Sequence, residues 1–356
     1  MHASAPDAAP AVSRCGIPAR DLDEVLRAGA ALWPVLAGGR VLVTGATGWF
    51  GTWLLDVLVA ANRAYRLDLR VLALSRDPDG FGRRFPDLHT APEIEWLAAD
   101  LRAPLPAAPG PLSHAIHAAT EASAQLNRSR PDLMFDTALE GTRHALDFAQ
   151  RGGCGEFLLV SSGAVYGPQP AGLAALPETH AGGPDPSRAG NAYAEGKRAA
   201  EQLGAIWLAR HGLRVKLARC FAFIGPHMPF ESHFAIGNFI ANAVARQPVV
   251  VRSDGSPRRS WLYMTDLMLW LFTILLRAEP MRAYNVGSAE GLAVGEVARR
   301  IAAQRGVPCE IQGRPGEPGD AYVPDISRAA RELGLVPRVG LDQAIARTCD
   351  WRAAHS

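Results

Sequence analysis

The stretch "RVLVTGATGWFGTWLLDVLVAA", residues 40–61, decides the fold of the sequence around it. It begins with an apolar run typical of a buried strand, turns through Gly45, Gly48 and Gly51, and continues with helical apolar spacing. Because glycine has no Cβ, such a turn can approach a pyrophosphate, and the N–H groups of the helix N-terminus then face the phosphates. The stretch therefore predicts a dinucleotide site. Further candidate cofactor contacts in the turn are Thr47, Trp49 and Phe50.

Strand and helix patterns alternate after this stretch, which predicts an α/β fold with a Rossmann-type, doubly wound parallel sheet and a smaller C-terminal substrate-binding lobe. We expect residues 1–38 to form an N-terminal extension with a short helix capped by Asp21. The nucleotide-binding domain is predicted over 39–219, with a return segment at 258–286. The substrate lobe is predicted over 220–257 and 287–356, with a ligand cleft between the two parts.

The composition narrows the class of partner. The chain has 356 residues, a formal net charge of +2 and 48% hydrophobic residues, so nucleic acid is not expected as a partner. The longest apolar run, residues 267–276, is shorter than the roughly 20 residues of a membrane span, so no membrane partner is expected. Five scattered cysteines show neither metal-ligand nor disulfide spacing, which predicts no metal and a cytoplasmic setting.

The strand after the glycine helix ends in "ALSRD", residues 73–77. An acidic side chain at its end would bind the ribose 2′-hydroxyl of NAD, whereas Ser75 and Arg76 suit the 2′-phosphate of NADP. NADP is therefore slightly favoured, and Asp77 keeps NAD open. A solvated strand end is the alternative for Arg76. Candidate cofactor contacts after the third and fourth strands are Asp100, Leu101, Ala118, Ala119 and Thr120.

Tyr193 and Lys197 are four residues apart in a helical pattern, so they share one helix face. A phenol, with a pKa of about 10, is a weak base at neutral pH. A nearby ammonium and the nicotinamide charge stabilise the phenolate, and a shift of three pKa units takes about 4 kcal/mol. The chain has only two lysines, and an ammonium here can also bind ribose hydroxyls. The pair predicts a general base, Tyr193, assisted by Lys197.

A hydroxyl partner for the tyrosine is expected after the fifth strand. There "SSGAVYG", residues 161–167, supplies Ser161 and Ser162. Side chains alternate along a strand, so only one of the two serines faces the cleft. A loop-capping role is the alternative for a serine at this place.

These motifs together resemble a known family. In order, the glycine turn, "HAAT" at 117–120, "SSGAVYG", "YAEGK" at 193–197, "GP" at 225–226 and "RRSWLYMTD" at 258–266 resemble the extended short-chain dehydrogenase/reductases. Over residues 39–352 the chain is similar to the NAD-dependent epimerase/dehydratase family, which acts on nucleotide-sugars. The resemblance implies a tightly held NAD(P), a nucleotide-hexose substrate and a homodimer formed through a four-helix bundle.

The resemblance also implies roles for single residues. Ser162 matches the catalytic hydroxyl, Tyr193 the base and Lys197 its partner. Arg259 matches the arginine that grips the diphosphate of the sugar-nucleotide, and Asn238 is a weaker candidate in the segment that covers the nucleotide. The other candidate substrate contacts are Glu121, Gly163 and Cys220.

Some positions depart from the family pattern. Ala222 stands for an asparagine that contacts the diphosphate, Ala138 stands for a helix asparagine, and Asp320 lies near an expected basic residue. The 4,6-dehydratases carry Asp-Glu directly after the catalytic Thr, where this chain has Gly163 and Ala164.

Because that acid pair is missing, a dehydratase would need a replacement. Glu121 after the fourth strand and Cys220 at the start of the substrate loop are the candidates. The alternative for Glu121 is an acid beside a helix dipole. The alternative for Cys220 is a buried apolar side chain.

The predicted first step is transient oxidation at sugar C4, with Tyr193 taking the hydroxyl proton and Ser162 bonding the forming carbonyl. A 4-epimerase needs no further acid or base and is slightly favoured over a 4,6-dehydratase that uses Glu121. An NADPH-dependent 4-keto-sugar reductase is a further alternative, which Ser75 and Arg76 support. A non-catalytic dinucleotide-binding regulator is the least favoured. The family suggests a place in polysaccharide or glycosylated-metabolite synthesis.

Overall fold

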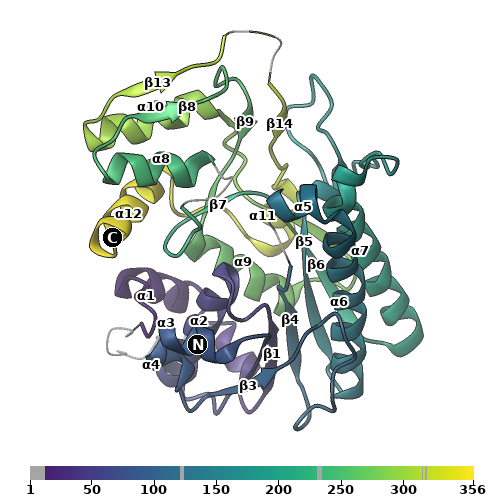
Figure 1. Cartoon of the computed structure of the whole chain (residues 1–356). Helices are drawn as coiled ribbons and strands as arrows, with labels where there is room; N and C mark the ends of the chain where they lie inside the picture. Colours follow the sequence, from purple (N-terminus) through teal and green to yellow (C-terminus); the bar gives the residue numbers. More distant parts are fainter. Residues whose placement is uncertain (1–12, 121–123, 231–234, 315, 317–318) are drawn as a thin grey trace. The chain divides into compact units, whose positions relative to one another are not determined.

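The computed structural model describes residues 13–120, 124–230, 235–314, 316 and 319–356 (Figure 1). The predicted α/β fold with a doubly wound parallel sheet is confirmed, and the largest sheet in these ranges has seven strands. They are β1 (Arg40–Thr44), β2 (Arg70–Ser75), β3 (Ile94–Ala98), β4 (His114–His117), β5 (Glu156–Ser162), β6 (Arg214–Cys220) and β11 (Ala283–Val286).

The order of these strands is β11–β6–β5–β4–β1–β2–β3, so the chain reverses its direction across the sheet at β1. Val41 of β1 lies opposite Val71 of β2 on one side and opposite His114 of β4 on the other, both in parallel register. In such sheets ligands bind beyond the carboxyl ends of the strands where the order reverses. The glycine turn follows β1 and Ala118 follows β4, so the sheet brings these two predicted segments to one edge.

The central strands are buried along consecutive residues, which means that both faces of the sheet are covered. Four of the five residues of β1 and five of the six of β2 are buried. Such strands are continuous apolar runs rather than alternating ones. Leu42, Leu72 and Phe157 share a buried cluster with Leu146 and Leu203 from helices on one face. Burying a side chain of this size contributes about 1.5–3 kcal/mol, so the cluster is a main source of stability.

The first compact unit comprises Met1–Ser161, Pro186–Ala218 and Met268–Ala283, which include β1 to β4 and most of β5 and β6, whereas most of β11 belongs to the second unit. Its helices are α1 (Ala19–Ala28), α2 (Trp49–Tyr65), α3 (Pro78–Arg84), α4 (Pro86–His89), α5 (Ala124–Ser129), α6 (Pro131–Arg151), α7 (Ala192–His211) and most of α9 (Met264–Arg277).

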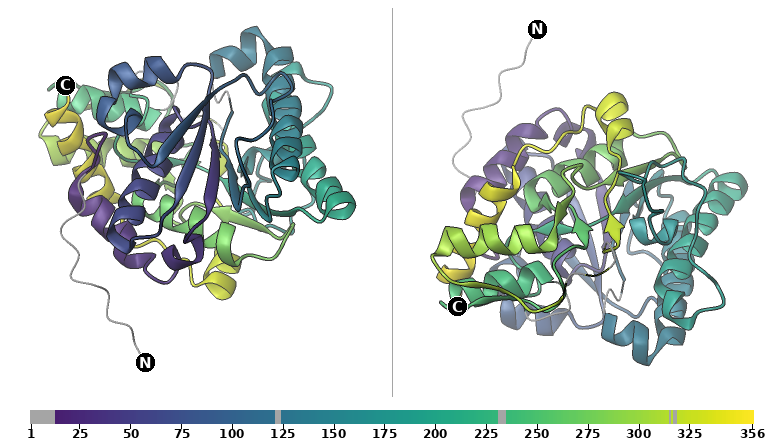
Figure 2. Two further views of the ribbon diagram at one scale, coloured as in Figure 1. Left: turned by 90° about the horizontal axis from the view of Figure 1, so that it is seen from below. Right: turned by 90° about the horizontal axis from the view of Figure 1, so that it is seen from above.

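The helices α6 and α7 lie side by side (Figure 1, Figure 2). A Cβ on Gly196 of α7 would lie only 2.8 Å from the Cβ of Ala138 on α6. Small residues at both positions therefore permit the close approach. This gives Ala138, one of the departures from the family pattern, a packing reason.

Lys216 on β6 is one of the two lysines of the chain, and it is buried. Its Nζ donates to the carbonyl of Ala278 and lies 3.1 Å from Oε2 of Glu156 on β5. A buried ammonium is costly unless it is paired and hydrogen-bonded, and both conditions are met here. Lys216 therefore links β6 to β5 and to the carbonyl of Ala278, which offsets the cost of its burial.

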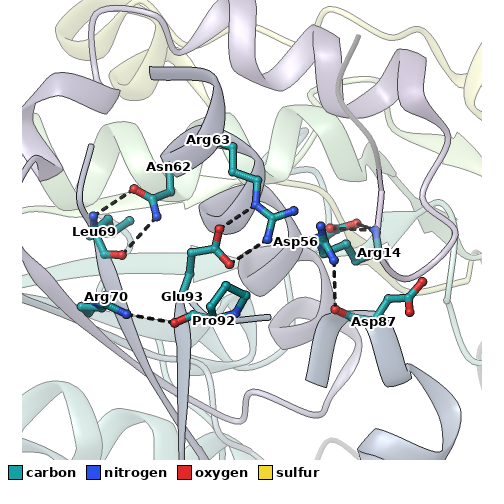
Figure 3. Close-up of polar contacts among 9 residues, drawn as sticks. All are labelled: Arg14, Asp56, Asn62, Arg63, Leu69, Arg70, Asp87, Pro92 and Glu93. Carbon is teal, nitrogen blue, oxygen red and sulfur yellow. Dashed lines mark hydrogen bonds and ion pairs between the residues drawn. The ribbon is translucent and has the colours of Figure 1, made fainter. Parts of the chain in front are cut away.

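Residues 13–17 are attached to α2 by the buried Asp56 (Figure 3). Its carboxylate accepts hydrogen bonds from Ser13 Oγ at 2.7 Å, the Arg14 backbone N–H at 3.1 Å and Cys15 Sγ at 3.2 Å. Burial raises the pKa of Asp56 to about 6, because these bonds only partly offset its desolvation. Figure 3 also shows Arg63 on α2 bound to Glu93 through two N–H groups, at 2.6 and 2.8 Å.

The short helix predicted in the N-terminal extension is α1, but the predicted cap is wrong. The helix begins at Ala19 and Pro18 occupies the N-cap position. Asp21 is buried in the first turn instead. Proline is tolerated at a helix start because its missing N–H has no intrahelical partner there.

The second compact unit comprises Ser162–Asp185, Arg219–Leu267 and Tyr284–Ser356. Its strands form small sheets: β7 (Phe223–Ile224) with β10 (Leu262–Tyr263), β8 (Val249–Val251) with β13 (Cys309–Ile311), and β9 (Arg258–Arg259) between β12 (Leu292–Ala293) and β14 (Ala321–Tyr322). Its helices are α8 (Ala235–Val244), α10 (Val294–Arg305), α11 (Ser327–Leu333) and α12 (Leu341–Ala354).

The observed units and the predicted domains have different boundaries. Ser162–Asp185 groups with the second unit although it lies inside the predicted range 39–219. The segment that returns to the first unit is Met268–Ala283, inside the predicted 258–286. Which unit binds which ligand stays a prediction.

Candidate active site

The glycine turn between β1 and α2 is a backbone cradle. Gly45 has φ +69°, and a Cβ on it would lie 2.7–2.8 Å from backbone atoms of Ala118 and Ala119. A Cβ on Gly51 would lie 2.1 Å from the carbonyl oxygen of Gly45. Gly48 is the N-cap of α2. Three predicted cofactor residues, Gly45, Ala118 and Ala119, therefore meet beside a helix N-terminus, where no side chain fits.

The hydroxyl of Ser75 at the end of β2 is engaged within the protein. It lies 3.1 Å from Thr47 Oγ1 of the glycine turn and accepts the backbone N–H of Asp77 at 3.2 Å. Asp77 in turn caps α3 by accepting the N–H of Gly80 at 2.8 Å. Arg76 is exposed at the strand end. Trp49 and Phe50, in the first turn of α2, are both partly exposed and pack edge to face.

Asp100 and Leu101, predicted to flank an adenine, have different surroundings. The Asp100 carboxylate is bound by the guanidinium of Arg102, which with the more distant Arg76 lowers the pKa of Asp100 to about 2. Leu101 is buried in the core cluster, and its carbonyl accepts a hydrogen bond from His144 Nδ1 at 2.7 Å. Only Asp100 thus keeps a partly exposed side chain.

His117 at the end of β4 is buried between two threonines. Thr142 donates to the carbonyl of Ala138, so its oxygen accepts from His117 Nε2 at 3.1 Å. The other ring nitrogen then accepts from Thr44 Oγ1 at 2.7 Å, and Thr44 accepts the N–H of Ala119 at 3.3 Å. Burial and the charge of Lys197 lower the pKa of His117 to about 3. The imidazole is therefore neutral and holds the backbone beside the cradle.

Tyr193 and Lys197 lie on α7, one turn apart, as their spacing predicted. Lys197 is only 3% exposed, and its Nζ donates to the carbonyl of Val160 on β5 at 2.8 Å. The backbone N–H of Tyr193 donates to Oδ1 of Asn127 at 3.2 Å, so Asn127 caps the start of α7. Sequence reasoning missed Asn127, because its helix partner is 66 residues away in the chain.

The two serines at the end of β5 have different partners. Ser161 Oγ donates to Oε1 of Glu201 on α7 at 2.6 Å, and both residues are buried. Ser162 faces the other way, and its Oγ accepts the N–H of Ala164 at 3.1 Å. Ser161 is thus committed to α7, which leaves Ser162 as the candidate hydroxyl. Glu201 was also missed, although it follows Lys197 by one helical turn.

Gly163, directly after Ser162, has no room for a side chain. A Cβ there would lie 2.6 Å from Phe221 Cζ and 2.6 Å from the Tyr322 hydroxyl. The rings of Phe221 and Tyr322 pack at 4.5 Å between centroids, so neither can move without disturbing the other. A carboxylate at position 163 would therefore clash.

The remaining predicted substrate residues lie in several places. Arg259 on β9 has its guanidinium bound by Asp320, at 2.8 Å from Oδ2. Cys220 is buried at the end of β6. Asn238 is exposed on α8. Thr120 is partly exposed after β4, and Glu121, which follows it, lies outside the described residues.

The described ranges show neither a metal-ligand cluster nor a membrane-spanning helix. No group of three or more His, Cys, Asp or Glu side chains in this part of the chain could hold a metal ion. No helix of the described residues combines the length and the apolar character needed to cross a bilayer.

Comparison with known proteins adds the decisive observation. The model of the NAD dependent epimerase/dehydratase family matches residues 41–287, more than half of the chain. The chain belongs to this family. The resemblance found in the motifs is confirmed, including the extended short-chain dehydrogenase/reductase type.

Curated members of the family match nearly the whole chain. It is 30% identical over 314 residues to UDP-glucuronic acid decarboxylase 2 of Arabidopsis thaliana, covering 86% of this chain and 67% of that protein. It is 27% identical over 328 residues to a dTDP-glucose 4,6-dehydratase of Streptomyces antibioticus, covering 88% and 92%. The family members that the chain resembles are therefore enzymes with different reactions.

Solved structures of the family share the fold. A dTDP-glucose 4,6-dehydratase of Streptomyces venezuelae, with NAD and TYD bound, matches with a TM-score of 0.75 and 21% identity over 88% of this chain and 97% of that one. A UDP-glucose 4-epimerase of Thermus thermophilus, in complex with NAD, matches with a TM-score of 0.71 and 26% identity over 88% and 99%. NAD is thus present in both neighbours.

Proposed function

We propose that this chain is an NAD(P)-dependent nucleotide-sugar enzyme that transiently oxidises C4 of a nucleotide-hexose, with C4 epimerisation as the favoured outcome. The observation that carries the proposal is the catalytic face of α7. There Tyr193 stands one turn from Lys197, whose buried ammonium is oriented by the carbonyl of Val160. A buried cation beside a phenol favours the phenolate. This arrangement supports proton abstraction from a hydroxyl.

The residues of the glycine turn fit a dinucleotide. The cradle at Gly45 and Gly51 would be filled by any Cβ, and the N-terminus of α2 offers N–H groups to a pyrophosphate. A bound nicotinamide would supply the acceptor for the C4 hydride and its later donor. Ser75 and Arg76 favour NADP slightly, whereas the solved relatives contain NAD, so both cofactors belong in the assay.

The side chains then divide the proton chemistry. The Tyr193 phenolate takes the proton of the C4 hydroxyl while the hydride leaves C4. Ser162 donates a hydrogen bond to the forming carbonyl oxygen. When the hydride returns to the other face of C4, the Tyr193 phenol gives its proton back to the oxygen. Protons and electrons balance without a further acid or base.

The crowding at Gly163 favours epimerisation over 4,6-dehydration. Elimination of water across C5 and C6 needs a base and an acid beside the sugar. The chain has no carboxylate at position 163 or 164, and a side chain at 163 would meet Phe221 and Tyr322.

Two other outcomes have specific support. The likeness to dTDP-glucose 4,6-dehydratases supports dehydration with Glu121 as the replacement acid or base. Ser75 and Arg76 support a net NADPH-dependent reduction of a 4-keto-sugar. The likeness to UDP-glucuronic acid decarboxylases makes UDP-glucuronate a necessary member of any substrate panel.

The test is incubation of the purified chain with UDP-, dTDP-, GDP- and CDP-hexoses and UDP-glucuronate, with NAD or NADP, followed by mass and proton NMR. Unchanged mass with altered ring couplings supports epimerisation. Loss of water indicates the dehydratase, loss of CO₂ the decarboxylase, and stoichiometric NADPH consumption the reductase. If the chain converts none of these compounds, the proposal is wrong. The homodimer expected from the family is measured on the same sample by light scattering.

A further inference from the structure

The guanidinium of Arg259, the proposed diphosphate contact, is held by hydrogen bonds to neighbouring residues. Tyr322 of β14 lies opposite Arg259 of β9 in parallel register, which brings Asp320 beside the arginine. Nη1 of Arg259 donates to the carbonyls of Arg258 at 2.9 Å and Asp320 at 3.0 Å. Nη2 donates to Oδ2 of Asp320 at 2.8 Å. Two backbone carbonyls and one carboxylate thus orient the guanidinium.

The two kinds of bond differ in how easily they are replaced. The carbonyl of Asp320 also accepts the backbone N–H of Arg258 at 2.9 Å, and Gly319 donates to Ser256 Oγ at 2.9 Å, so this segment is fixed along its backbone. The Asp320 side chain is 72% exposed, against 29% for Arg259. The carboxylate can therefore turn into water while the strands stay paired.

A phosphate would compete for the same donor. Arginine binds phosphate through a fork of two N–H groups, and the edge formed by Nε and Nη2 is the one not used by the carbonyls here. Nη2 lies on that edge, and it already donates a hydrogen bond to Asp320 Oδ2. Two anions on one guanidinium would repel each other, so the carboxylate has to leave when a phosphate binds.

We propose that Asp320 is a built-in competing anion that lowers the affinity of Arg259 for the diphosphate of the substrate. This rests on the proposed function, because it takes Arg259 as a diphosphate contact. Exposed ion pairs are weak, so displacement of Asp320 costs little and the substrate still binds. The effect is a weaker and less salt-sensitive hold on the phosphate than an unpaired arginine would give.

The test measures binding of UDP and dTDP to the full-length chain by calorimetry. Asp320→Asn is expected to bind the better of these ligands about two- to fivefold more tightly. Asp320→Lys is expected to bind it more tightly still, because affinity follows the charge at position 320. Arg259→Gln is expected to weaken binding by roughly 10- to 100-fold, the loss of a charged hydrogen bond. In the Arg259→Gln background, Asp320→Asn is expected to have no effect.

The matched control is Asp350→Asn. Asp350 is 73% exposed and pairs with Arg305 at 3.0 Å, so it has nearly the exposure of Asp320 in an ion pair elsewhere in the second unit. Its replacement is expected to leave the affinity unchanged. The gain from Asp320→Asn is also expected to shrink as salt is raised.

The outcomes separate this proposal from the one on which it rests. If Arg259→Gln weakens binding but Asp320→Asn does not strengthen it, Asp320 is no competitor, and Arg259 keeps its role. If Arg259→Gln has no effect, or neither nucleotide binds, the diphosphate role of Arg259 and this proposal fail together. If Asp320→Asn tightens binding of phosphate-free uridine equally, the effect is not competition, and the proposal is wrong.

Discussion

The surroundings of Lys197 explain why a lysine rather than an arginine stands at this position of α7. Its ammonium is 3% exposed and donates to the Val160 carbonyl, so it is a compact charge held inside the protein. A guanidinium is larger and planar, and its donors point in other directions. The site therefore accepts an amine more readily than it would accept arginine.

The first prediction concerns this pair. Tyr193→Phe removes the proposed base, and turnover of whichever nucleotide-sugar is converted is expected to fall by about 10²- to 10⁴-fold. Lys197→Arg keeps the positive charge but not its position, and an intermediate loss is expected. Steady-state kinetics measures both, and circular dichroism checks the fold. Native turnover in Tyr193→Phe would refute the assigned mechanism.

The second prediction at this scale concerns Gly163. Gly163→Ala places a Cβ 2.6 Å from both Phe221 Cζ and the Tyr322 hydroxyl, so the two packed rings must shift. The expected loss of stability is about 1–3 kcal/mol, measured by urea unfolding. Gly190→Ala is the control, because apart from Gly190 itself and its two chain neighbours no atom lies within 4 Å of a Cβ there. Equal stability of the two variants would contradict the crowding argument.

Single residues were predictable where their chemistry was local. The glycine turn and the Tyr193–Lys197 spacing are both visible within a short stretch of sequence. The pairing of Arg259 with Asp320 spans 61 residues, and the crowding of Gly163 depends on Phe221 and Tyr322. Such contacts exist only after folding, so no local pattern predicts them.

At the scale of elements, β5 and α7 are joined by two buried bonds. Val160 accepts from Lys197, and Ser161 donates to Glu201 one helical turn further on. The next residue of β5 is Ser162, the candidate hydroxyl. The strand therefore carries a structural serine and a proposed catalytic serine side by side.

The third prediction separates these neighbours. Ser161→Ala leaves the buried Glu201 oxygen without its hydroxyl donor, and a loss of about 1–3 kcal/mol in the free energy of unfolding is expected. Ser162→Ala is expected to reduce turnover much more than stability. Urea unfolding and steady-state kinetics on both variants measure the two effects. Should both serines affect only stability, Ser162 has no catalytic role.

The order of elements was predictable because helical and strand periodicities alternate clearly along the chain. The boundaries of the elements were less predictable. Asp21 was expected to cap α1, but the helix begins earlier at Ala19, after Pro18. A capping side chain and an acidic residue in the first turn have the same sequence signature, so residue type alone does not distinguish them.

At the scale of the molecule, Asp56 links stability to pH. Its folded pKa is about 6, against 3.8 as its ordinary value. The folded state then holds the proton more tightly than the unfolded state between these values, so stability falls as pH rises from about 4 to about 6. The full change is about 3 kcal/mol.

The fourth prediction tests this with Asp56→Asn. As pH rises from 4 to 6.5, the free energy of unfolding of the wild type is expected to fall relative to that of the variant. Above this range the difference is expected to stay constant. Urea unfolding at each pH gives the curve, and comparison with the variant cancels the other titrating groups. A difference independent of pH would show that Asp56 is not a protonated buried acid in this range.

The division into units was only partly visible in the sequence. No sequence pattern marks Ser162, where the chain passes from the first unit to the second. Compactness depends on contacts between distant segments, so the loop Ser162–Asp185 could not be assigned from its residues alone.

Both lysines of this chain, Lys197 and Lys216, are buried, so the exposed side chains among its lysines and arginines all carry guanidinium groups. Succinimidyl esters and other acylating reagents would not react with these two side chains while the protein is folded. Acylation of either one then reports transient opening of the core, and modification mapped by mass spectrometry would time that opening without an attached probe.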